Sequence, residues 1–410
     1  MNKEHTVMDQ FQQQDNQLII GGKSLSQIEL LVGRTPYYAY DKQVIQHTIN
    51  QLNQKLPSQI KLHYAIKANP LPAIVHFIKP LVSGFDVASK NEMLLALQTG
   101  IEPEEISFAG PGKTSDDIQA SIIAGITLHV ESENEIKKII HFSKSLKIKA
   151  NIAIRVNPIF ELKASGMKMS GGSKPFGIDE ERLPNILKHL NYETINFRGF
   201  HIFAGSQSLS HDAIIEMHNK TFELIQKLIE LTPINIQYIN IGGGFGIPYF
   251  PGDTRLNINA ICKNLSILLE QATNLESIDL ILELGRYIVG ESGIYVTKIT
   301  DKKISRDKTY LVCDGGLHHH LSNSGNFGQI IRKNYPVTIG NRLQASPVSN
   351  QQIVNIVGPL CTPLDILAQE VLLPMAVEGD FVVVYQSGAY GASASPKDFL
   401  SQPSVLEILL

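Results

Sequence analysis

HYAIKANP (residues 63–70) places Lys67 at the end of an apolar, strand-like run and directly before an Asn-Pro turn. Burying an ammonium group costs several kcal/mol unless a partner compensates it. Burial also lowers the pKa of a lysine, and the neutral amine is a nucleophile. The ordinary alternative is a strand-end lysine whose ammonium reaches solvent. The rest of the sequence is needed to distinguish a buried, nucleophilic Lys67 from one that reaches solvent.

Strand-like runs alternate with helix-like segments on both sides of this stretch, from residue 43 to residue 285. Apolar residues recur at helical spacing in segments such as SENEIKKIIHFSKSL and HDAIIEMHNKTFELIQKLIELT. The strand candidates are KLHYAIKA, GFDVAS, ISFAG, TLHVES, IAIRVN, NFRGFHIFAG, QYINIGGG and LILELG. Eight strands alternating with helices over about 240 residues predict a (β/α)8 barrel of the TIM type.

The pattern changes after residue 285. The runs GIYVTKITDKK, KTYLVCDGG, NIVGPLC and DFVVVYQSGAYG are β-rich and are punctuated by Gly, Pro and Asn. We therefore expect an α/β plus β fold with three regions. They are an N-terminal segment (1–42) whose strand TPYYAYD completes the β domain, the barrel (43–285), and a C-terminal β domain (286–410).

Composition narrows the class of protein. The chain has 410 residues, of which 43% are hydrophobic and 18% charged, as is ordinary for a globular protein. A net charge of −3 gives no electrostatic case for nucleic acid or an anionic membrane. No run approaches the roughly 18 apolar residues of a membrane span, and no apolar core of signal-peptide length follows the first residues. Three widely separated cysteines argue against a disulfide framework, so we expect a cytoplasmic protein.

Active-site residues of such barrels lie at the C-terminal ends of the strands. Those positions hold Lys67, Asp86, Glu131, Asn157, His201, Gly242–Gly244 and Glu283. A single histidine inside a strand, such as His201, is more often a core residue than a catalytic one. Ser206 and Gln207 follow the same strand and would add donors for a phosphate.

Glycines cluster in NIGGGFGIPY (240–249). A dinucleotide fingerprint would need a glycine at position 247, which is Ile, and Pro248 blocks the turn into a helix. The glycines still let backbone N–H groups approach a phosphate, although a tight turn explains them equally well. In ELGR (283–286), Glu283 could face a protonated heterocyclic nitrogen and Arg286 an oxyanion; an internal ion pair is the alternative.

Two turns of the β domain carry reactive side chains. GPLCTPLD (358–365) places Cys361 in a Gly/Pro-framed turn, where a buried inert thiol is the usual interpretation. SGAYGAS (387–393) brackets Tyr390 with glycines. The run GGLHHHL (315–321) does not predict a metal site, because successive strand residues point to opposite faces and no further ligand spacing supports one.

Seven segments occur in an order that identifies a family: YAIKAN, GFDVAS, GFHIFAGSQ, IGGGFG, ELGRY, GPLC and GAYG. Over nearly its whole length the chain resembles the fold-type III pyridoxal-phosphate-dependent decarboxylases, the diaminopimelate and ornithine decarboxylase family. The resemblance implies a barrel plus a β domain, pyridoxal 5'-phosphate as cofactor, and loss of the α-carboxylate of an amino acid as CO2.

The resemblance also implies roles for individual residues. Lys67 holds the cofactor as a Schiff base, His201 stacks on its ring, and Glu283 keeps the pyridine nitrogen protonated. Cys361 protonates Cα after CO2 has left, and it enters the site from a second subunit, which implies a homodimer with shared sites. The implied cofactor-binding positions further include Asp86, Ser206, Gly243, Gly244, Gly285, Arg286 and Tyr390, and the implied substrate-binding positions are Arg286, Cys361 and Thr362.

The departures from the family pattern concern the substrate. Relatives that act on diamino acids carry an acidic residue directly after the cysteine, whereas this chain has Thr362. A distal ammonium would lose a partner worth about 1.5–3 kcal/mol. Leu284 replaces a proline common in the family, with little expected consequence. The stretches CDGGLHHHLSNSGNFGQ, GPLCTPLD and YQSGAYGASASPKDFLSQP look similar to an exosortase-associated subgroup and to decarboxylases of carrier-protein-tethered aminoacyl groups.

Several alternatives stay open. The chain could be a conventional diaminopimelate, ornithine or lysine decarboxylase. An enzyme of the alanine-racemase type would use a tyrosine where this chain has Cys361, and a non-catalytic relative would lack Lys67 or Cys361. The segment ELKASGMKMSGGSKPFG (161–177) is predicted to be a mobile loop whose lysines, at 163, 168 and 174, could meet an anionic group.

Overall fold

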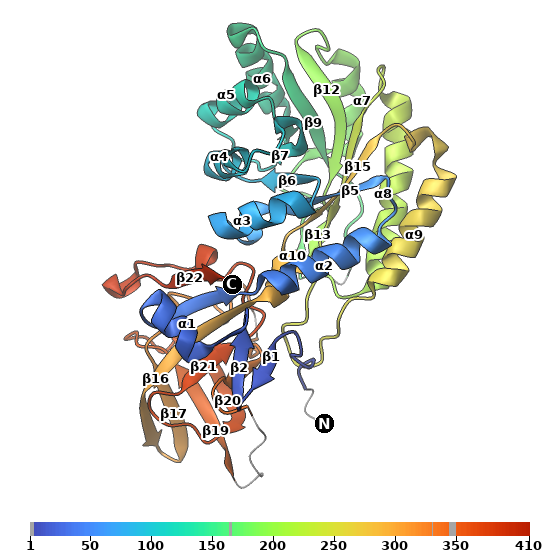
Figure 1. The fold of residues 1–410 in the computed structure, drawn as a ribbon. Coiled ribbons are helices and arrows are strands. Elements are labelled where there is room, and N and C mark those ends of the chain that lie inside the picture. The colour runs from blue at the N-terminus through green and yellow to red at the C-terminus, as the bar shows by residue number, and fades with distance from the viewer. Residues whose placement is uncertain (1–3, 164–165, 330, 344–349) are drawn as a thin grey trace. The chain divides into compact units, whose positions relative to one another are not determined.

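The computed structural model describes residues 4–163, 166–329, 331–343 and 350–410. The chain folds into two compact units, coloured along the sequence in Figure 1. The barrel unit comprises Thr48–Gly246 and Leu256–Tyr287, and the β unit comprises Met1–His47, Ile247–Arg255 and Ile288–Leu410. The predicted regions did not anticipate that Ile247–Arg255, which lies between two barrel strands in sequence, belongs to the β unit.

The barrel unit contains a closed parallel sheet of eight strands. They are β5 (Ile60–Ala65), β6 (Gly84–Val87), β7 (Ile106–Phe108), β8 (Thr127–Val130), β9 (Ala150–Asn157), β12 (Ile195–Ile202), β14 (Tyr238–Gly243) and β15 (Asp279–Leu284). Each strand pairs with the next, and β15 pairs with β5 to close the ring. The short strand β11 (Ile178–Asp179) also pairs with β9. All eight strands overlap the predicted runs, and four of them begin one or two residues earlier, so the predicted barrel is confirmed.

Helices alternate with these strands and lie around the barrel (Figure 1). Helix α2 (Lys42–Lys55) leads into the unit, followed by α3 (Pro72–Ile78), α4 (Lys90–Gln98), α5 (Ser115–Ala124), α6 (Glu133–Leu146), α7 (Leu183–His189), α8 (His211–Leu231) and α9 (Ile258–Gln271). Four of them begin at a hydroxyl side chain that accepts a backbone N–H, namely those of Ser89, Thr114, Ser132 and Ser210. Such caps satisfy N–H groups that have no partner within the helix, so the sequence marks where these helices start.

The β unit is built on a sheet in the order β18-β21-β16-β17-β19-β20. These strands are β18 (Val337–Ile339), β21 (Phe381–Val384), β16 (Gly293–Ser305), β17 (Lys308–Cys313), β19 (Gln351–Val357) and β20 (Ile366–Pro374). The N-terminal strand β4 (Tyr37–Tyr40) pairs antiparallel with β16 and parallel with β22 (Leu406–Leu409). The N-terminal strand therefore completes the β domain, as predicted. A small sheet of β1 (Gln12–Gln14), β2 (Gln17–Ile20) and β3 (Lys23–Ser24) precedes α1 (Leu25–Val32).

Strand β4 is buried on both faces. Tyr37 and Ala39 belong to an apolar core that also includes Phe11, Leu18, Ile20, Leu25, Ile28, Ile294, Val296, Phe381, Val383 and Tyr385. The Tyr38 ring lies on the opposite face, 5.1 Å from the ring of Tyr295 between centroids. The Tyr38 hydroxyl donates to the His319 carbonyl at 2.7 Å. Alternate side chains of one strand thus stabilise two layers of the unit.

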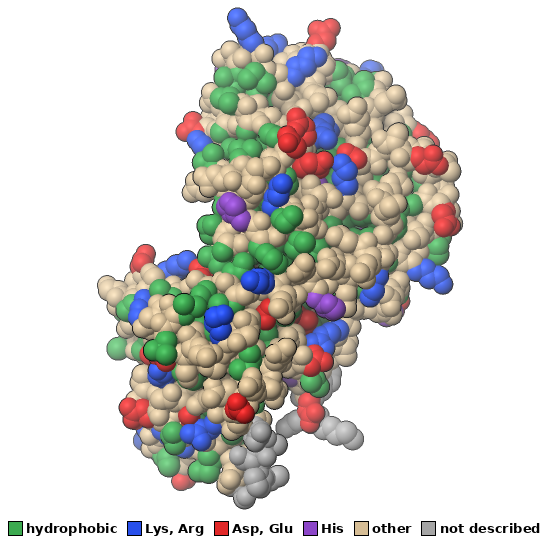
Figure 2. Space-filling view, viewed as in Figure 1, with side chains coloured by type: hydrophobic (Ala, Val, Ile, Leu, Met, Phe, Trp, Pro, Cys, Tyr) green, Lys and Arg blue, Asp and Glu red, His purple; other side chains and the backbone are tan. Residues whose placement is uncertain are grey.

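The surface mixes charges of both signs. Lysines, arginines and carboxylates are interspersed over the face of both units that Figure 2 shows. Within the described ranges, no helix has both the length and the apolar character that a membrane crossing requires.

Tyr38→Phe should lower the free energy of unfolding of the β unit by about 1–3 kcal/mol, because it leaves the buried His319 carbonyl without its donor. Hydrogen exchange of β4 and β16 peptides in increasing urea measures this change. Leu30→Ala, at a side chain 84% exposed in the same unit, is the control and should change the value by less than about 0.5 kcal/mol. Equal exchange in both variants would show that the hydroxyl does not stabilise the unit.

Candidate active site

Lys67 lies between two buried carboxylates at one end of the barrel. It follows β5 in a short 3-10 turn, Ile66–Ala68. Its Nζ lies 3.1 Å from Asp86 Oδ2 and 3.3 Å from Glu283 Oε1. The Lys67 side chain is 35% exposed, whereas those of Asp86 and Glu283 are at most 2% exposed. The cation is therefore compensated and its amine is still accessible.

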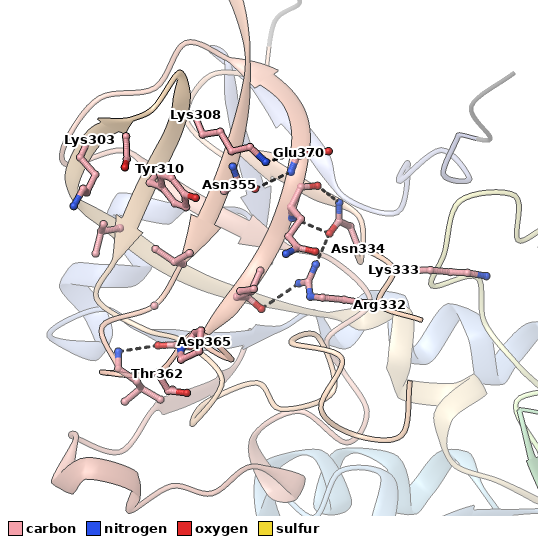
Figure 3. Close-up of a pocket in the computed structure, with 18 of the residues that line it drawn as sticks. Lys303, Lys308, Tyr310, Arg332, Lys333, Asn334, Asn355, Thr362, Asp365 and Glu370 are labelled. Atoms are coloured by element: carbon pink, nitrogen blue, oxygen red, sulfur yellow. Dashed lines mark hydrogen bonds and ion pairs between the residues drawn. The ribbon is translucent and has the colours of Figure 1, made fainter. Parts of the chain in front are cut away.

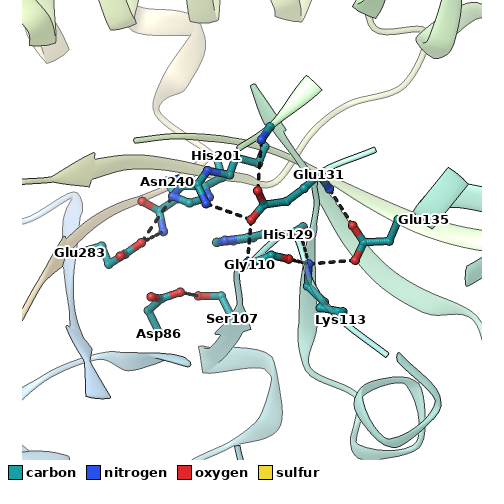
Figure 4. Close-up of polar contacts among 12 residues, drawn as sticks. Asp86, Ser107, Gly110, Lys113, His129, Glu131, Glu135, His201, Asn240 and Glu283 are labelled. Atoms are coloured by element: carbon teal, nitrogen blue, oxygen red, sulfur yellow. Dashed lines mark hydrogen bonds and ion pairs between the residues drawn. The ribbon is translucent and has the colours of Figure 1, made fainter. Parts of the chain in front are cut away.

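The two carboxylates differ in their surroundings (Figure 4). Asp86 accepts a hydrogen bond from Ser107 Oγ at 3.3 Å, and burial followed by the negative charge of Glu283 raises its pKa well above the usual range. Glu283 accepts from Asn240 Nδ2 at 3.3 Å. Burial alone would raise the pKa of Glu283, but the Lys67 ammonium and His201 hold it well below its ordinary value. Glu283 is thus the carboxylate that stays ionised.

Two buried histidines lie against each other beside this cluster, with their rings tilted by 31°. The ring centroids of His129, in β8, and His201, in β12, are 4.2 Å apart. His201 Nε2 lies 3.4 Å from Glu283 Oε2, and His129 Nε2 lies 3.0 Å from the hydroxyl of Tyr238. Burial lowers the pKa of both histidines, so both imidazoles are neutral near pH 7. His201 Nδ1 has no hydrogen-bond partner among the described residues.

A second ionised pair lies at the ends of β8 and β9. Arg155 Nη1 donates to Glu131 Oε1 at 2.9 Å. Glu131 also accepts from the backbone N–H groups of Gly110, at 2.6 Å, and Gly177, at 3.1 Å. Burial would raise the pKa of Glu131, but Arg155 and then Lys113 lower it below its usual value. Charge, hydrogen bonds and burial together fix the Arg155 guanidinium in place.

The predicted glycines lie where two stretches of backbone approach closely. A Cβ on Gly243 would lie 1.9 Å from the Glu283 carbonyl oxygen, and one on Gly244 (φ +84°) 2.1 Å from the Gly205 carbonyl oxygen. A Cβ on Gly285 would lie 2.8 Å from Ala68 Cβ, next to Lys67. These glycines are therefore required for packing at the strand ends. Gly205 belongs to the short strand β13 (Gly205–Ser206), which places Ser206 beside Gly244.

The remaining predicted residues are placed as follows. Arg286 begins the short helix α10 (Arg286–Val289), directly after β15. Cys361, Thr362 and Tyr390 belong to the β unit. Cys361 is exposed whereas Cys262 and Cys313 are buried, so the usual interpretation of a single cysteine as a buried thiol does not apply to Cys361.

Asp365 holds the turn that carries Cys361. It is 2% exposed, and its carboxylate accepts the N–H of Leu360 at 2.8 Å and that of Leu317 at 2.6 Å. Its carbonyl accepts the N–H of Gly358 at 3.0 Å. The acid at the end of GPLCTPLD was not recognised from the sequence as a residue that orders this turn.

The contacts of the histidine run, residues 318–320, indicate a structural role. His320 Nε2 lies 2.9 Å from Ser387 Oγ, and the rings of His318 and His319 are 3.7 Å apart. Burial lowers the pKa of all three histidines. In the part of the chain that the structure describes, no three His, Cys, Asp or Glu side chains are grouped so that they could hold a metal ion.

The sequence analysis missed His129, Arg155 and Asn240 as members of the site. Strand register pairs His201 with Arg155 on one side and with Asn240 on the other. Each of the three is a polar residue with an apolar neighbour on either side within its strand, and this is the signal that could have found them.

The lysine-rich segment is partly ordered by its own contacts. Its strand β10 (Met167–Lys168) pairs with β13, while residues 164–165 lie outside the described residues. Lys163 Nζ lies 2.9 Å from Glu216, and Lys168 Nζ lies 2.7 Å from Glu161. Two of its three lysines already pair with carboxylates, so the segment offers less positive charge to a ligand than its sequence suggests.

Comparison with known proteins agrees with this geometry. The family profile described as "Pyridoxal-dependent decarboxylase, pyridoxal binding domain" matches residues 42–290. The chain is 34% identical over 379 residues to L-glutamyl-[BtrI acyl-carrier protein] decarboxylase of Niallia circulans, covering 92% of this chain and 88% of that protein.

Two further relatives cover similar shares. The 2-[(L-alanin-3-ylcarbamoyl)methyl]-2-hydroxybutanedioate decarboxylase of Staphylococcus aureus is 30% identical over 377 residues, which are 90% of this chain and 92% of that protein. The crystal structure of Helicobacter pylori diaminopimelate decarboxylase complexed with L-lysine superposes with a TM-score of 0.82 at 28% identity, covering 94% of each chain. The chain therefore belongs to the pyridoxal-dependent decarboxylase family and is a pyridoxal-phosphate-dependent amino-acid decarboxylase.

Proposed function

We propose that this enzyme decarboxylates an aminoacyl group that is acylated or tethered to a carrier protein, rather than a free diamino acid. The observation that carries the proposal is Thr362, a neutral residue directly after Cys361, where relatives that bind a distal ammonium have an acid. Two relatives support it, because their names specify a carrier-bound glutamyl group and an amide of a hydroxy acid.

The barrel residues fit pyridoxal phosphate. Lys67 would hold the cofactor through its aldehyde, because its amine is the accessible member of the charged cluster. The permanently ionised Glu283 would favour a protonated ring nitrogen, and the neutral ring of His201 offers a flat surface to an aromatic ring. When bound, the cofactor accepts the electron pair that the departing CO2 leaves behind.

Further residues complete the proposed site. Ser206, Gly243, Gly244 and Tyr390 would bind the cofactor phosphate. The other residues proposed to contact the cofactor are Asp86, Gly285 and Arg286, of which Arg286 would also bind a substrate oxyanion.

Cys361 would return a proton to the substrate Cα. Its exposure supports this role, because a thiol that donates a proton to a ligand must be accessible. We further propose a homodimer in which Cys361 serves the site of the partner subunit. Apolar side chains that are more than half exposed on the β unit support an interface there; they include Ile304, Ile331, Ile353, Leu364 and Leu372.

The second candidate is a conventional diaminopimelate decarboxylase, since relatives of that name include the enzyme of Aquifex aeolicus at 30% identity. We place the enzyme in the cytoplasm, because all three cysteines are free thiols, as is usual in a reducing compartment.

Lys67→Ala should abolish covalent attachment of the cofactor, because the accessible amine beside Asp86 and Glu283 is lost. Mass spectrometry after borohydride reduction measures the pyridoxyl group. Lys61→Ala is the matched control, because Lys61 lies in the preceding strand at similar exposure and should leave attachment unchanged. A pyridoxyl group found on another lysine of the wild-type enzyme would refute the assignment.

Mixing inactive Lys67→Ala and Cys361→Ala proteins should restore up to about a quarter of the wild-type activity, because random exchange in a two-fold dimer regenerates one intact site per mixed dimer. Native mass spectrometry confirms the exchange. The unmixed variants are the controls and should stay inactive or slow. No recovery despite demonstrated exchange would contradict the shared site.

Thr362→Glu should raise kcat/KM for a free diamino acid by roughly tenfold or more, which corresponds to about 1.4 kcal/mol, by supplying a partner for the distal ammonium. It should also weaken the native reaction. Thr362→Gln is the control, because glutamine has nearly the size of glutamate but carries no charge. A wild-type enzyme that already decarboxylates meso-diaminopimelate with kcat/KM on the order of 10^4 M⁻¹s⁻¹ would instead favour the conventional function.

A further inference from the structure

The β unit contains an open cavity of about 1110 Å³ that is lined only by residues of that unit. One face of the sheet forms its floor, and the turn after β19 forms one end (Figure 3). Leu360 and Thr362 line that end, on either side of Cys361 in sequence. The cavity thus begins at the turn that carries the proposed proton donor.

The cavity follows strand β17. Lys308, Tyr310 and Val312 line it, whereas the alternate residues Leu311 and Cys313 are buried in the core. The five residues from Lys308 to Val312 span about 13 Å at the usual rise of a strand. Figure 3 shows Thr362 and Asp365 together at one end, and Lys303, Lys308 and Tyr310 at the other. Its shape suits a long ligand better than a compact amino acid.

The end far from Thr362 is cationic and rich in hydrogen-bond donors. Lys303, in β16, is directly opposite Tyr310, which is in turn opposite Asn355 in β19. Lys308 Nζ lies 3.0 Å from the exposed carboxylate of Glu370. Two ammonium groups, a phenol and an amide therefore lie on one face of three adjacent strands. Such a set of donors binds the oxygens of an anion.

Arg332 lines the cavity, but its guanidinium binds other groups of the protein and not a ligand. Its guanidinium donates to the carbonyls of Ser324 and Ile366 and to Asn334 Oδ1. Burial lowers its pKa to about 10. Lys333 Nζ lies 5.7 Å from the centroid of the Phe250 ring. Because Lys308 is already paired with Glu370, the charge offered to a ligand at the far end comes from Lys303.

The middle of the cavity is apolar. Val312 and Val357 are direct cross-strand neighbours, and Leu360 follows them toward Thr362. Among the described lining residues on the strands, no charged side chain lies between Val312 and Lys308. An uncharged chain could lie against it without losing charge partners.

We propose that this cavity binds the distal part of the substrate as an extended arm that ends in an oxyanion, held by Lys303, Lys308 and Tyr310. This inference rests on the proposed function, since it takes Cys361 as the residue beside the reacting carbon. The phosphodiester of a carrier-protein arm has this chemistry, and so do the carboxylates of a polycarboxylic acyl group. Free diamino acids do not, because their distal ammonium would face the ammonium of Lys303.

The charge of the cavity agrees with this assignment. Four cationic side chains and two carboxylates line it, although the whole chain has a net charge of −3. The positive excess is therefore local. It is placed about one strand length from the Cys361 turn.

Binding to the holoenzyme tests the cavity without relying on turnover. Isothermal titration calorimetry with 4'-phosphopantetheine should show binding that Lys303→Glu weakens roughly tenfold or more. Tyr310→Phe, which keeps the ring, should weaken it less. Lys23→Glu, an exposed lysine of the same unit outside the cavity, is the matched control and should change nothing.

The choice of probe separates the sources of the anion. Pantetheine without phosphate should bind more weakly, and its affinity should not depend on Lys303. Citrate with a Lys303-dependent affinity above that of phosphopantetheine would point to a polycarboxylic acyl group. Inorganic phosphate that binds as tightly as either would show an adventitious anion site only and would overturn the proposal. Equal affinities of wild type and Lys303→Glu would overturn it as well.

Steady-state kinetics then test the assignment of the cavity and the proposed function separately. With an aminoacyl-carrier-protein substrate, Lys303→Glu should raise KM roughly tenfold and leave kcat unchanged, whereas Lys23→Glu should alter neither. If the wild type turns over such a substrate and Lys303→Glu has the same KM, the cavity assignment is wrong and the proposed function stands. If the wild type acts only on free diamino acids, the proposed function is wrong, and the calorimetry alone decides what the cavity binds.

Discussion

The pairing of one lysine with two buried carboxylates is the constraint on which the barrel site depends. Asp86 and Glu283 have almost no exposure to solvent, and ionised groups in that position require a cation within hydrogen-bond distance. Lys67 supplies this cation. It follows β5, and the two carboxylates lie on the neighbouring strands, Glu283 on β15 and Asp86 on β6. Lys67 and Glu283 are 216 residues apart in sequence, so only closure of the barrel brings them together.

The groups next to the Lys67 cluster are neutral or are paired with a group of opposite charge. The neutral imidazoles of His129 and His201 lie beside Glu283, and Glu131 is neutralised by Arg155. The pKa of Glu283 is lowered in the folded protein, so its contribution to stability is present above its ordinary pKa of 4.5 and is lost as the pH falls toward the folded-state value. Acid should therefore loosen the Lys67 cluster by protonating Glu283, because the raised pKa of Asp86 means that this carboxyl takes up its proton at a higher pH. Burial lowers the pKa of His129 and His201, so both rings stay neutral to a lower pH than an exposed histidine.

Much of this architecture could be predicted from the sequence because its signals are local. Apolar runs of strand length, hydroxyl caps and glycines at crowded strand ends each act over a few residues. The partners of Arg155 and Asn240 could not be predicted in this way, since they depend on the register between strands that are far apart in sequence. The same reason explains why Asp365 and Ile247–Arg255 were missed. Their roles arise from contacts with distant segments of the β unit.

Under the proposed function, the barrel unit holds the cofactor, and the β unit supplies the proton donor Cys361 and the contacts that select the substrate. In the barrel unit, replacing a member of the Lys67 cluster leaves a buried charge without its partner, which is costly and limits variation. In the β unit, the residues at the far end of the cavity lie on an exposed sheet face, where most substitutions change stability by less than about 0.5 kcal/mol. Residues such as Lys303, Lys308 and Thr362 can therefore differ between relatives without disturbing either core. A family with one buried amine-carboxylate cluster can acquire new substrates through a face that folding does not constrain.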